Sequence, residues 1–143
     1  MDLSDPKHAW ADQQLRSRLI LWLTTVRTNG QPQTSPVWFV YDGESILMYS
    51  IPTSPKVANI QGNPRVAMNV DGDGRGGGIL TMEGTARIDE TAPPVNAMPG
   101  YVEKYEELIK EMGTEAEPFA TLFSTPIRIM PTRVRVYLGE ADG

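Results

Sequence analysis

Two dipeptides that favour tight turns divide the first third of the chain into short β-rich runs. Asn29-Gly30 follows residues 20–28, which are rich in β-branched and aromatic side chains, and Asp42-Gly43 follows residues 34–41. Such dipeptides between β-rich runs are the strongest short-range signal of a β-hairpin, because a type I′ turn needs two positive φ angles. With residues 45–50 as a third run, the pattern predicts three antiparallel strands joined as a meander.

The rest of the chain alternates further strand patterns with helical ones. The expected elements are helices over residues 6–19, 54–61, 93–112 and 118–123, and strands over residues 65–70, 79–88 and 126–139, the last of them bent by Pro131 or placed at an edge. Hairpins dominate and there is no β-α-β repeat. We therefore predict a mainly β (α+β) fold, a closed or nearly closed antiparallel barrel of six strands with flanking helices. The length of 143 residues suits a single domain over residues 1–143.

A glycine-rich segment, DGDGRGGG at residues 71–78, lies between two of these expected strands. A phosphate-binding P-loop would also need a lysine followed by serine or threonine, and neither is present. Glycine clusters mark connections far more often than phosphate sites. We therefore interpret the segment as an exposed loop.

The composition excludes several kinds of chemistry. The chain has no cysteine, and its only histidine is His8, so a histidine-based metal or haem site would depend on that one residue. We predict no metal site. The net charge of −5 disfavours general nucleic-acid binding, because that binding depends on neutralising phosphates. No apolar run is long enough for a membrane span and the N-terminus lacks a signal-peptide pattern, so we expect a cytoplasmic protein without a membrane partner.

Three segments together resemble a known family. They are TVRTNGQPQTSPVWFV at residues 25–40, MYSIPTSPKVANIQGNPRVAMNV at residues 48–70, and RIMPTRVRVYLG at residues 128–139. The combination resembles the pyridoxamine-5′-phosphate-oxidase-like family, and within it the F420-dependent flavin/deazaflavin oxidoreductases of actinobacteria. The resemblance implies an antiparallel six-stranded split β-barrel of the FMN-binding type. It also implies a homodimer with the cofactor at the subunit interface.

The resemblance places the cofactor ring beside the strand that holds Ser35, Pro36, Val37 and Trp38. A proline leaves one ladder position without a donor, which is consistent with a strand edge that meets a ligand. Trp38 and Phe39 point to opposite faces because they are neighbours on a strand, so one of them can line the ring slot. Two ordinary packing aromatics are the alternative interpretation.

The resemblance places the cofactor phosphate at the end of the third strand and the start of the following helix. Tyr49, Ser50, Ser54 and Lys56 match that stretch, and Arg65 is a further cationic candidate. Hydroxyls, a lysine and free backbone N–H groups at a helix N-terminus are suited to bind an anion. A solvated lysine is the alternative interpretation for Lys56.

The resemblance favours F420 as the cofactor, with FMN as the alternative. The implied activity is an F420H2-dependent reductase that transfers a hydride to a small organic acceptor such as an activated alkene. The sequence identifies neither a catalytic acid nor the physiological substrate. An FMN-dependent oxidoreductase of the same fold, and a non-catalytic flavin- or tetrapyrrole-binding module, are the alternatives.

Overall fold

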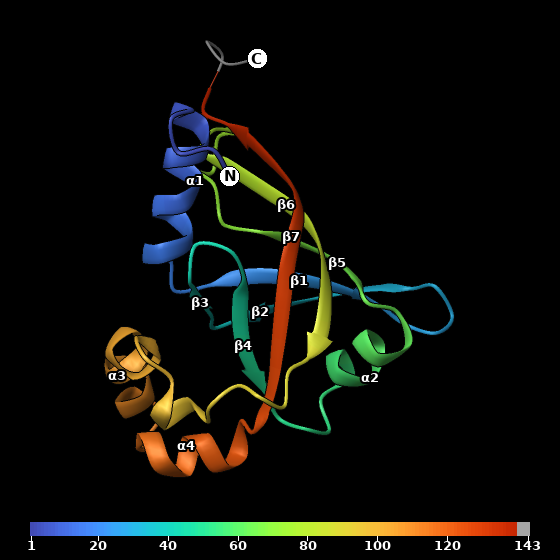
Figure 1. Ribbon diagram of the computed structural model, residues 1–143, viewed down its shortest axis with the longest axis vertical. Helices are drawn as coiled ribbons and strands as arrows, with labels where there is room; N and C mark the ends of the chain where they lie inside the picture. Colours follow the sequence, from blue (N-terminus) through green and yellow to red (C-terminus); the bar gives the residue numbers. More distant parts are fainter. Residues whose placement is uncertain (140–143) are drawn as a thin grey trace.

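The computed structural model describes residues 1–139, which form one antiparallel sheet with helices around it (Figure 1). The strands are β1 (Leu21–Val26), β2 (Pro32–Val37), β3 (Val40–Tyr41), β4 (Ile46–Ser50), β5 (Arg65–Asn69), β6 (Ile79–Ile88) and β7 (Thr125–Tyr137). The helices are α1 (Pro6–Ser17), α2 (Pro55–Gly62), the 3₁₀ turn η1 (Val95–Ala97), α3 (Tyr101–Glu111) and α4 (Ala116–Leu122). Every element predicted from the sequence therefore has a counterpart close to its expected position.

The order of the strands shows that the sheet curls into a split barrel. The seven strands are hydrogen-bonded in the order β2-β1-β5-β6-β7-β4-β3. Only Trp38 and Phe39 separate β2 from β3 along the chain, yet these strands form the two opposite edges of the sheet. Two residues cannot span a flat seven-stranded sheet, because neighbouring strands lie about 4.8 Å apart. The edges must therefore approach each other, as the predicted barrel requires.

The structure corrects the prediction of six strands and of a three-stranded meander, because one expected strand is interrupted. The run over residues 34–41 was expected to be one strand, but its first part pairs with β1 and its end pairs with β4. The chain changes edge at Trp38-Phe39, so one expected strand becomes β2 and β3. The resulting count is seven within residues 1–139.

Both hairpins lie where the turn dipeptides predict them, but the turn type differs. Gly30 has φ +87° and Gly43 has φ +97°, whereas no residue other than glycine has a positive φ within residues 1–139. In the first loop, Gly30 N–H donates to Arg27 O at 2.8 Å and Arg27 N–H donates to Gln31 O at 2.9 Å. This is a three-residue loop with glycine in the left-handed region, which needs one positive φ angle instead of the two of a type I′ turn.

Strand β4 separates two hydrophobic clusters, because successive side chains on a strand point to opposite faces. Ile46 and Met48 lie in the barrel cluster, which joins α1 to the inward faces of the sheet. Leu47 and Tyr49 lie in an outer cluster with side chains from η1, α3 and α4. All of β4 is consequently buried. Its second buried face positions the candidate site.

The pairing of the two longest strands, β6 and β7, is irregular at one point. The register between β6 and β7 shifts at Glu83/Gly84, opposite Pro131. A Cβ atom at Gly84 would lie 2.8 Å from Met130 O, so the backbones approach too closely there for any other residue. The irregularity lies opposite Pro131, where the sequence predicts a bend or an edge position, and β7 is not at an edge of the sheet.

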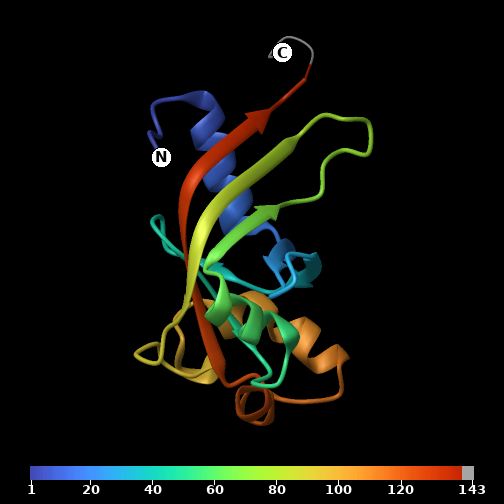
Figure 2. The same cartoon turned by 90° about the vertical axis from the view of Figure 1, so that its right-hand side faces the viewer.

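The helices gather at two ends of the sheet. Figures 1 and 2 show α1 along one end, beside the N-terminus, and α2, α3 and α4 at the other. The glycine-rich segment connects β5 to β6, as predicted, and Asp73 orders it by accepting hydrogen bonds from Arg75 and Gly77 N–H. No helix within residues 1–139 is long and apolar enough to cross a membrane.

Candidate functional site

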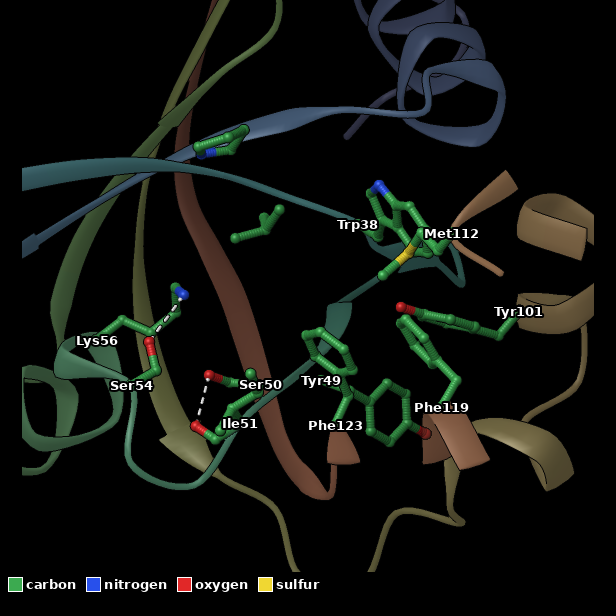
Figure 3. Close-up of a pocket in the computed structure, with 12 residues that line it drawn as sticks. Trp38, Tyr49, Ser50, Ile51, Ser54, Lys56, Tyr101, Met112, Phe119 and Phe123 are labelled. Carbon is green, nitrogen blue, oxygen red and sulfur yellow. Dashed lines mark hydrogen bonds between the residues drawn. The ribbon is translucent and has the colours of Figure 1, made fainter. Parts of the chain in front are cut away.

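A pocket of about 200 Å³ lies at the helix-rich end of the barrel, between β2, β4, α2 and the α3–α4 arm (Figure 3). Side chains from four separate stretches of the sequence line it. They are Pro36, Val37 and Trp38; Tyr49, Ser50 and Ile51; Ser54 and Lys56; and Tyr101, Met112, Phe119 and Phe123. The pocket therefore forms only when segments spread over residues 36–123 pack against one another.

One end of the pocket is polar. Ser54 caps the N-terminus of α2, but its hydroxyl makes no capping hydrogen bond and instead accepts one from Lys56 Nζ at 3.1 Å. The Ser50 hydroxyl donates to Ile51 O at 3.0 Å. Partial burial lowers the pKa of Lys56. Because a cation removed from water gains from an anionic partner, this end is suited to a phosphate or carboxylate group.

The other end of the pocket is aromatic. The Trp38 ring stacks between Tyr105, at 4.8 Å between centroids, and Phe119, at 5.4 Å. Phe119 stacks in turn on Phe123 at 4.3 Å. Figure 3 shows Trp38, Phe119 and Phe123 on the side of the pocket away from Ser54 and Lys56. A slot with flat apolar walls and few polar groups is typical of sites for planar cofactors and substrates.

Two side chains of α3 bind the backbone of the two-residue connection between β2 and β3. The Tyr105 hydroxyl accepts a hydrogen bond from Phe39 N–H at 2.9 Å and donates to Leu19 O at 2.7 Å. Lys104 Nζ donates to Phe39 O at 2.9 Å and lies 3.8 Å from the centre of the Phe39 ring. Burial lowers the pKa of Lys104 to about 8. These contacts fix Trp38, which can then line the pocket while Phe39 is fully buried in the barrel cluster.

The two tyrosines on the pocket wall differ in what their hydroxyls contact. Tyr49 donates to Pro93 O at 2.5 Å, and burial raises its pKa to about 12. Its hydroxyl is therefore occupied and poorly suited to give up a proton. Tyr101 packs edge-on against the Tyr49 ring at 5.3 Å. No hydrogen bond involving its hydroxyl is present among the described residues.

An ion-pair network lies where the chain leaves β6 for η1 and the α3–α4 arm. Asp89 follows β6 and is 3% exposed. Its carboxylate accepts hydrogen bonds from the Thr91 hydroxyl at 2.5 Å and from Arg128 Nε at 2.6 Å. These hydrogen bonds, that from Thr91 first, lower the pKa of Asp89 well below its usual range. Arg128, on β7, also donates to the Ser45 hydroxyl at 2.8 Å, so the network joins the start of β4 and the end of β6 to β7.

The structure brings together seven of the nine predicted cofactor-binding residues: Pro36, Val37, Trp38, Tyr49, Ser50, Ser54 and Lys56. Ser35 lies one residue before this group on β2 but does not line the pocket. Arg65 begins β5 at the far end of α2 from Ser54, and lines a separate surface hollow with Thr24 and Pro32. Binding by all nine residues stays a prediction.

Sequence reasoning missed the contribution of α3 and α4. The sequence places Tyr101 and Met112 in the expected helix over residues 93–112, and Phe119 and Phe123 in the one over residues 118–123, and assigns none of them to a site. All four line the pocket. Their helical spacing identifies a buried face, but nothing in that spacing says whether the face packs on a core or on a cavity. Within residues 1–139, no group of His, Cys, Asp and Glu is placed to bind a metal ion.

The fold and its pocket define a split-barrel protein of the cofactor-binding type. The family described as Pyridoxamine 5′-phosphate oxidase matches residues 8–135 of the chain. The chain therefore belongs to the pyridoxamine 5′-phosphate oxidase family, as the sequence resemblance predicts. A comparison with curated proteins finds no match.

Several solved structures share the fold. The structure of an F420 reductase is 25% identical, covers 87% of this chain and 94% of its own, and gives a TM-score of 0.65. The heme storage protein HutZ from Vibrio cholerae is 18% identical over 96% of each chain, with a TM-score of 0.63. General Stress Protein 26 from Bacillus anthracis is 15% identical over 88% of this chain and 89% of its own, with a TM-score of 0.61. The fold thus occurs in proteins with different functions.

Proposed function

We propose that this protein is an F420H2-dependent reductase that transfers a hydride to a small organic acceptor such as an activated alkene. The observation that carries the proposal is the pocket, which combines a polar end at Lys56 with an aromatic end at Trp38 and Phe119. The similarity to an F420 reductase at 25% identity supports the choice of cofactor.

The residues present fit such a cofactor. Lys56, Ser54 and Ser50 would hold the phosphate, because they supply a cation and two hydroxyls beside the start of α2. Pro36, Val37 and Trp38 would lie along the ring system, with the ring of Tyr49 beside them. Ser35 and Arg65 would contact the cofactor outside this pocket.

A reduced deazaflavin supplies a hydride when it is bound. The protein's part is to orient the acceptor and to exclude water with the rings of the α3–α4 arm. Tyr49 is not the proton donor in this proposal, because its hydroxyl is held by Pro93 O. Solvent supplies the proton that completes reduction of the alkene.

FMN is the second candidate cofactor, and one observation favours it. Lys56 is the only charged side chain that lines this pocket in the described part of the chain. One cation matches the single phosphate of FMN, whereas the oligoglutamate tail of F420 would need further cations, such as Arg65.

We also propose a homodimer with the cofactor at the subunit interface, which sedimentation of the purified protein will test.

Titration separates the two cofactors. We expect F420 to bind more tightly than FMN, measured by calorimetry and by cofactor absorbance, and F420H2 to be oxidised in the presence of an enone. Micromolar or tighter FMN binding without F420 binding would reverse the choice of cofactor. Binding of neither would contradict the enzyme proposal.

A further inference from the structure

The buried tyrosines around α3 differ in one respect. Tyr49 and Tyr105 donate their hydroxyl protons to backbone carbonyls, at Pro93 and Leu19 respectively. Tyr101 is 1% exposed, and among residues 1–139 its hydroxyl has no hydrogen-bond partner. Buried polar groups are nearly always paired, since an unmade hydrogen bond is costly. An unpaired hydroxyl on so buried a side chain therefore calls for a partner from outside the chain.

The Tyr101 hydroxyl is directed into the pocket. Tyr101 is one of the lining residues, and Figure 3 shows its oxygen pointing into the cavity between Met112 and Phe119. Its oxygen is not among the fully enclosed atoms that lack a partner, because there are none in the described residues. The oxygen is therefore open to the cavity while the rest of the side chain is packed.

The surroundings define what this hydroxyl can bind. Burial raises the pKa of Tyr101, so the phenol stays protonated and can donate to an acceptor oxygen. Lys56, the pocket's cation, lies at the opposite end (Figure 3). Exposed acids flank the aromatic end in the sequence, with Glu111 next to Met112, and Glu115 and Glu117 at the start of α4. No cationic side chain among the described residues lines this end of the pocket, so it offers no partner for a negatively charged ligand.

We propose that the Tyr101 hydroxyl donates a hydrogen bond to the carbonyl oxygen of an uncharged, planar acceptor that stacks in the aromatic end of the pocket. This inference rests on the proposed function, because it assigns the acceptor to the end away from the cofactor phosphate. It makes Tyr101 a substrate-binding residue that selects carbonyl compounds.

Matched ligands test the hydrogen bond. Coumarin and 2H-chromene have the same fused rings, but only coumarin carries a carbonyl oxygen. Their dissociation constants are measured by calorimetry or ligand-observed NMR, without cofactor and with saturating oxidised F420. We expect wild type to prefer coumarin, and Tyr101→Phe to lose that preference through coumarin binding that is roughly three- to tenfold weaker. Equal binding of the two ligands by wild type, or no coumarin binding under either condition, would overturn the proposal.

Tyr41→Phe is the control, because it removes a tyrosine hydroxyl that donates to Gly43 O within the protein and does not line this pocket. It should keep the preference for coumarin, whereas Tyr101→Phe should lose it. An unchanged preference in Tyr101→Phe would overturn the proposal. So would an equal loss of preference in both variants, because the effect would then be a general one on packing.

Two further measurements distinguish this proposal from a role of the hydroxyl in cofactor binding and from a charged acceptor. Tyr101→Phe should bind F420 with an affinity within twofold of wild type; a loss as large as the loss for coumarin would assign the hydroxyl to the cofactor instead. Coumarin-3-carboxylate should bind more weakly than coumarin, and tighter binding would overturn the uncharged class of acceptor. If coumarin selectivity depends on Tyr101 but neither F420 nor FMN binds, the proposed function fails while the binding role of Tyr101 stands.

Discussion

The two hydrophobic clusters share strand β4 but differ in what they are made of. The barrel cluster is largely aliphatic, and side chains such as Leu23, Leu80 and Ile127 are fully buried. The outer cluster is rich in aromatic residues and includes Tyr101, Phe119 and their neighbours on η1 and α3. Only the outer cluster supplies several walls of the pocket. We therefore expect the barrel cluster to carry most of the stability of the fold and the outer cluster to carry the proposed binding function.

The largest expected effect is on the barrel cluster. Ile127→Ala should lower the free energy of unfolding by about 2–5 kcal/mol, because it leaves a cavity where β4 and β7 pair. Phe123→Ala, in the outer cluster, should cost less, since its ring is partly exposed and faces the pocket. Urea unfolding measures both. An equal loss in the two variants would remove the distinction between the clusters.

The next effect is on binding. Lys56→Ala should weaken cofactor binding by about ten- to a hundredfold, because a charge-assisted hydrogen bond contributes about 1.5–3 kcal/mol. Added salt should weaken wild type more than the variant, since salt screens the charge that the variant lacks. Calorimetry at two salt concentrations checks this. Lys110→Ala, at an exposed lysine of α3 that pairs with Glu106, is the control and should bind like wild type.

A smaller loss of stability is expected within the outer cluster. Tyr105→Phe should lower the free energy of unfolding by about 1–3 kcal/mol, because Leu19 O and the Phe39 backbone lose their shared partner. Tyr101→Phe should unfold at nearly the wild-type temperature, since its hydroxyl has no partner among the described residues. Thermal unfolding compares the two. A Tyr101→Phe protein as destabilised as Tyr105→Phe would show that the hydroxyl is structural.

The smallest expected effect is a change in how stability depends on pH. Hydrogen bonds from Thr91 and Arg128 lower the pKa of Asp89 in the folded state, from its ordinary value of 3.8. The stabilisation is therefore fully present above about pH 4 and is lost as pH falls toward the folded-state pKa. Asp89→Asn should remove that part of the acid sensitivity, seen as a flatter plot of unfolding free energy below pH 4. An unchanged slope would mean that the network with Arg128 does not contribute.

Local patterns were enough to predict most of the barrel. Asn29-Gly30 and Asp42-Gly43 located both hairpins, because glycine can adopt the positive φ angle that each turn needs. The alternation over residues 79–88 matches β6, and Pro131 marks the irregular pairing of β6 with β7. The family resemblance, which covers β2, β4 and the start of α2, supplied the seven predicted residues that line the pocket. The turns and the strand pattern depend on neighbours in the sequence.

Tertiary contacts decided the strand count and the aromatic end of the pocket. The break at Trp38-Phe39, which turns six expected strands into seven, arises because the Tyr105 hydroxyl and Lys104 bind the Phe39 backbone from 65 or 66 residues away. The aromatic end of the pocket likewise forms only when α3 and α4 pack on the outer face of β4. The sequence by itself determined where the chain turns and which faces are apolar, since turn preference and periodicity are local properties. Only the tertiary structure decided which apolar face borders a cavity and left the Tyr101 hydroxyl without a partner among residues 1–139, since both depend on packing between distant segments.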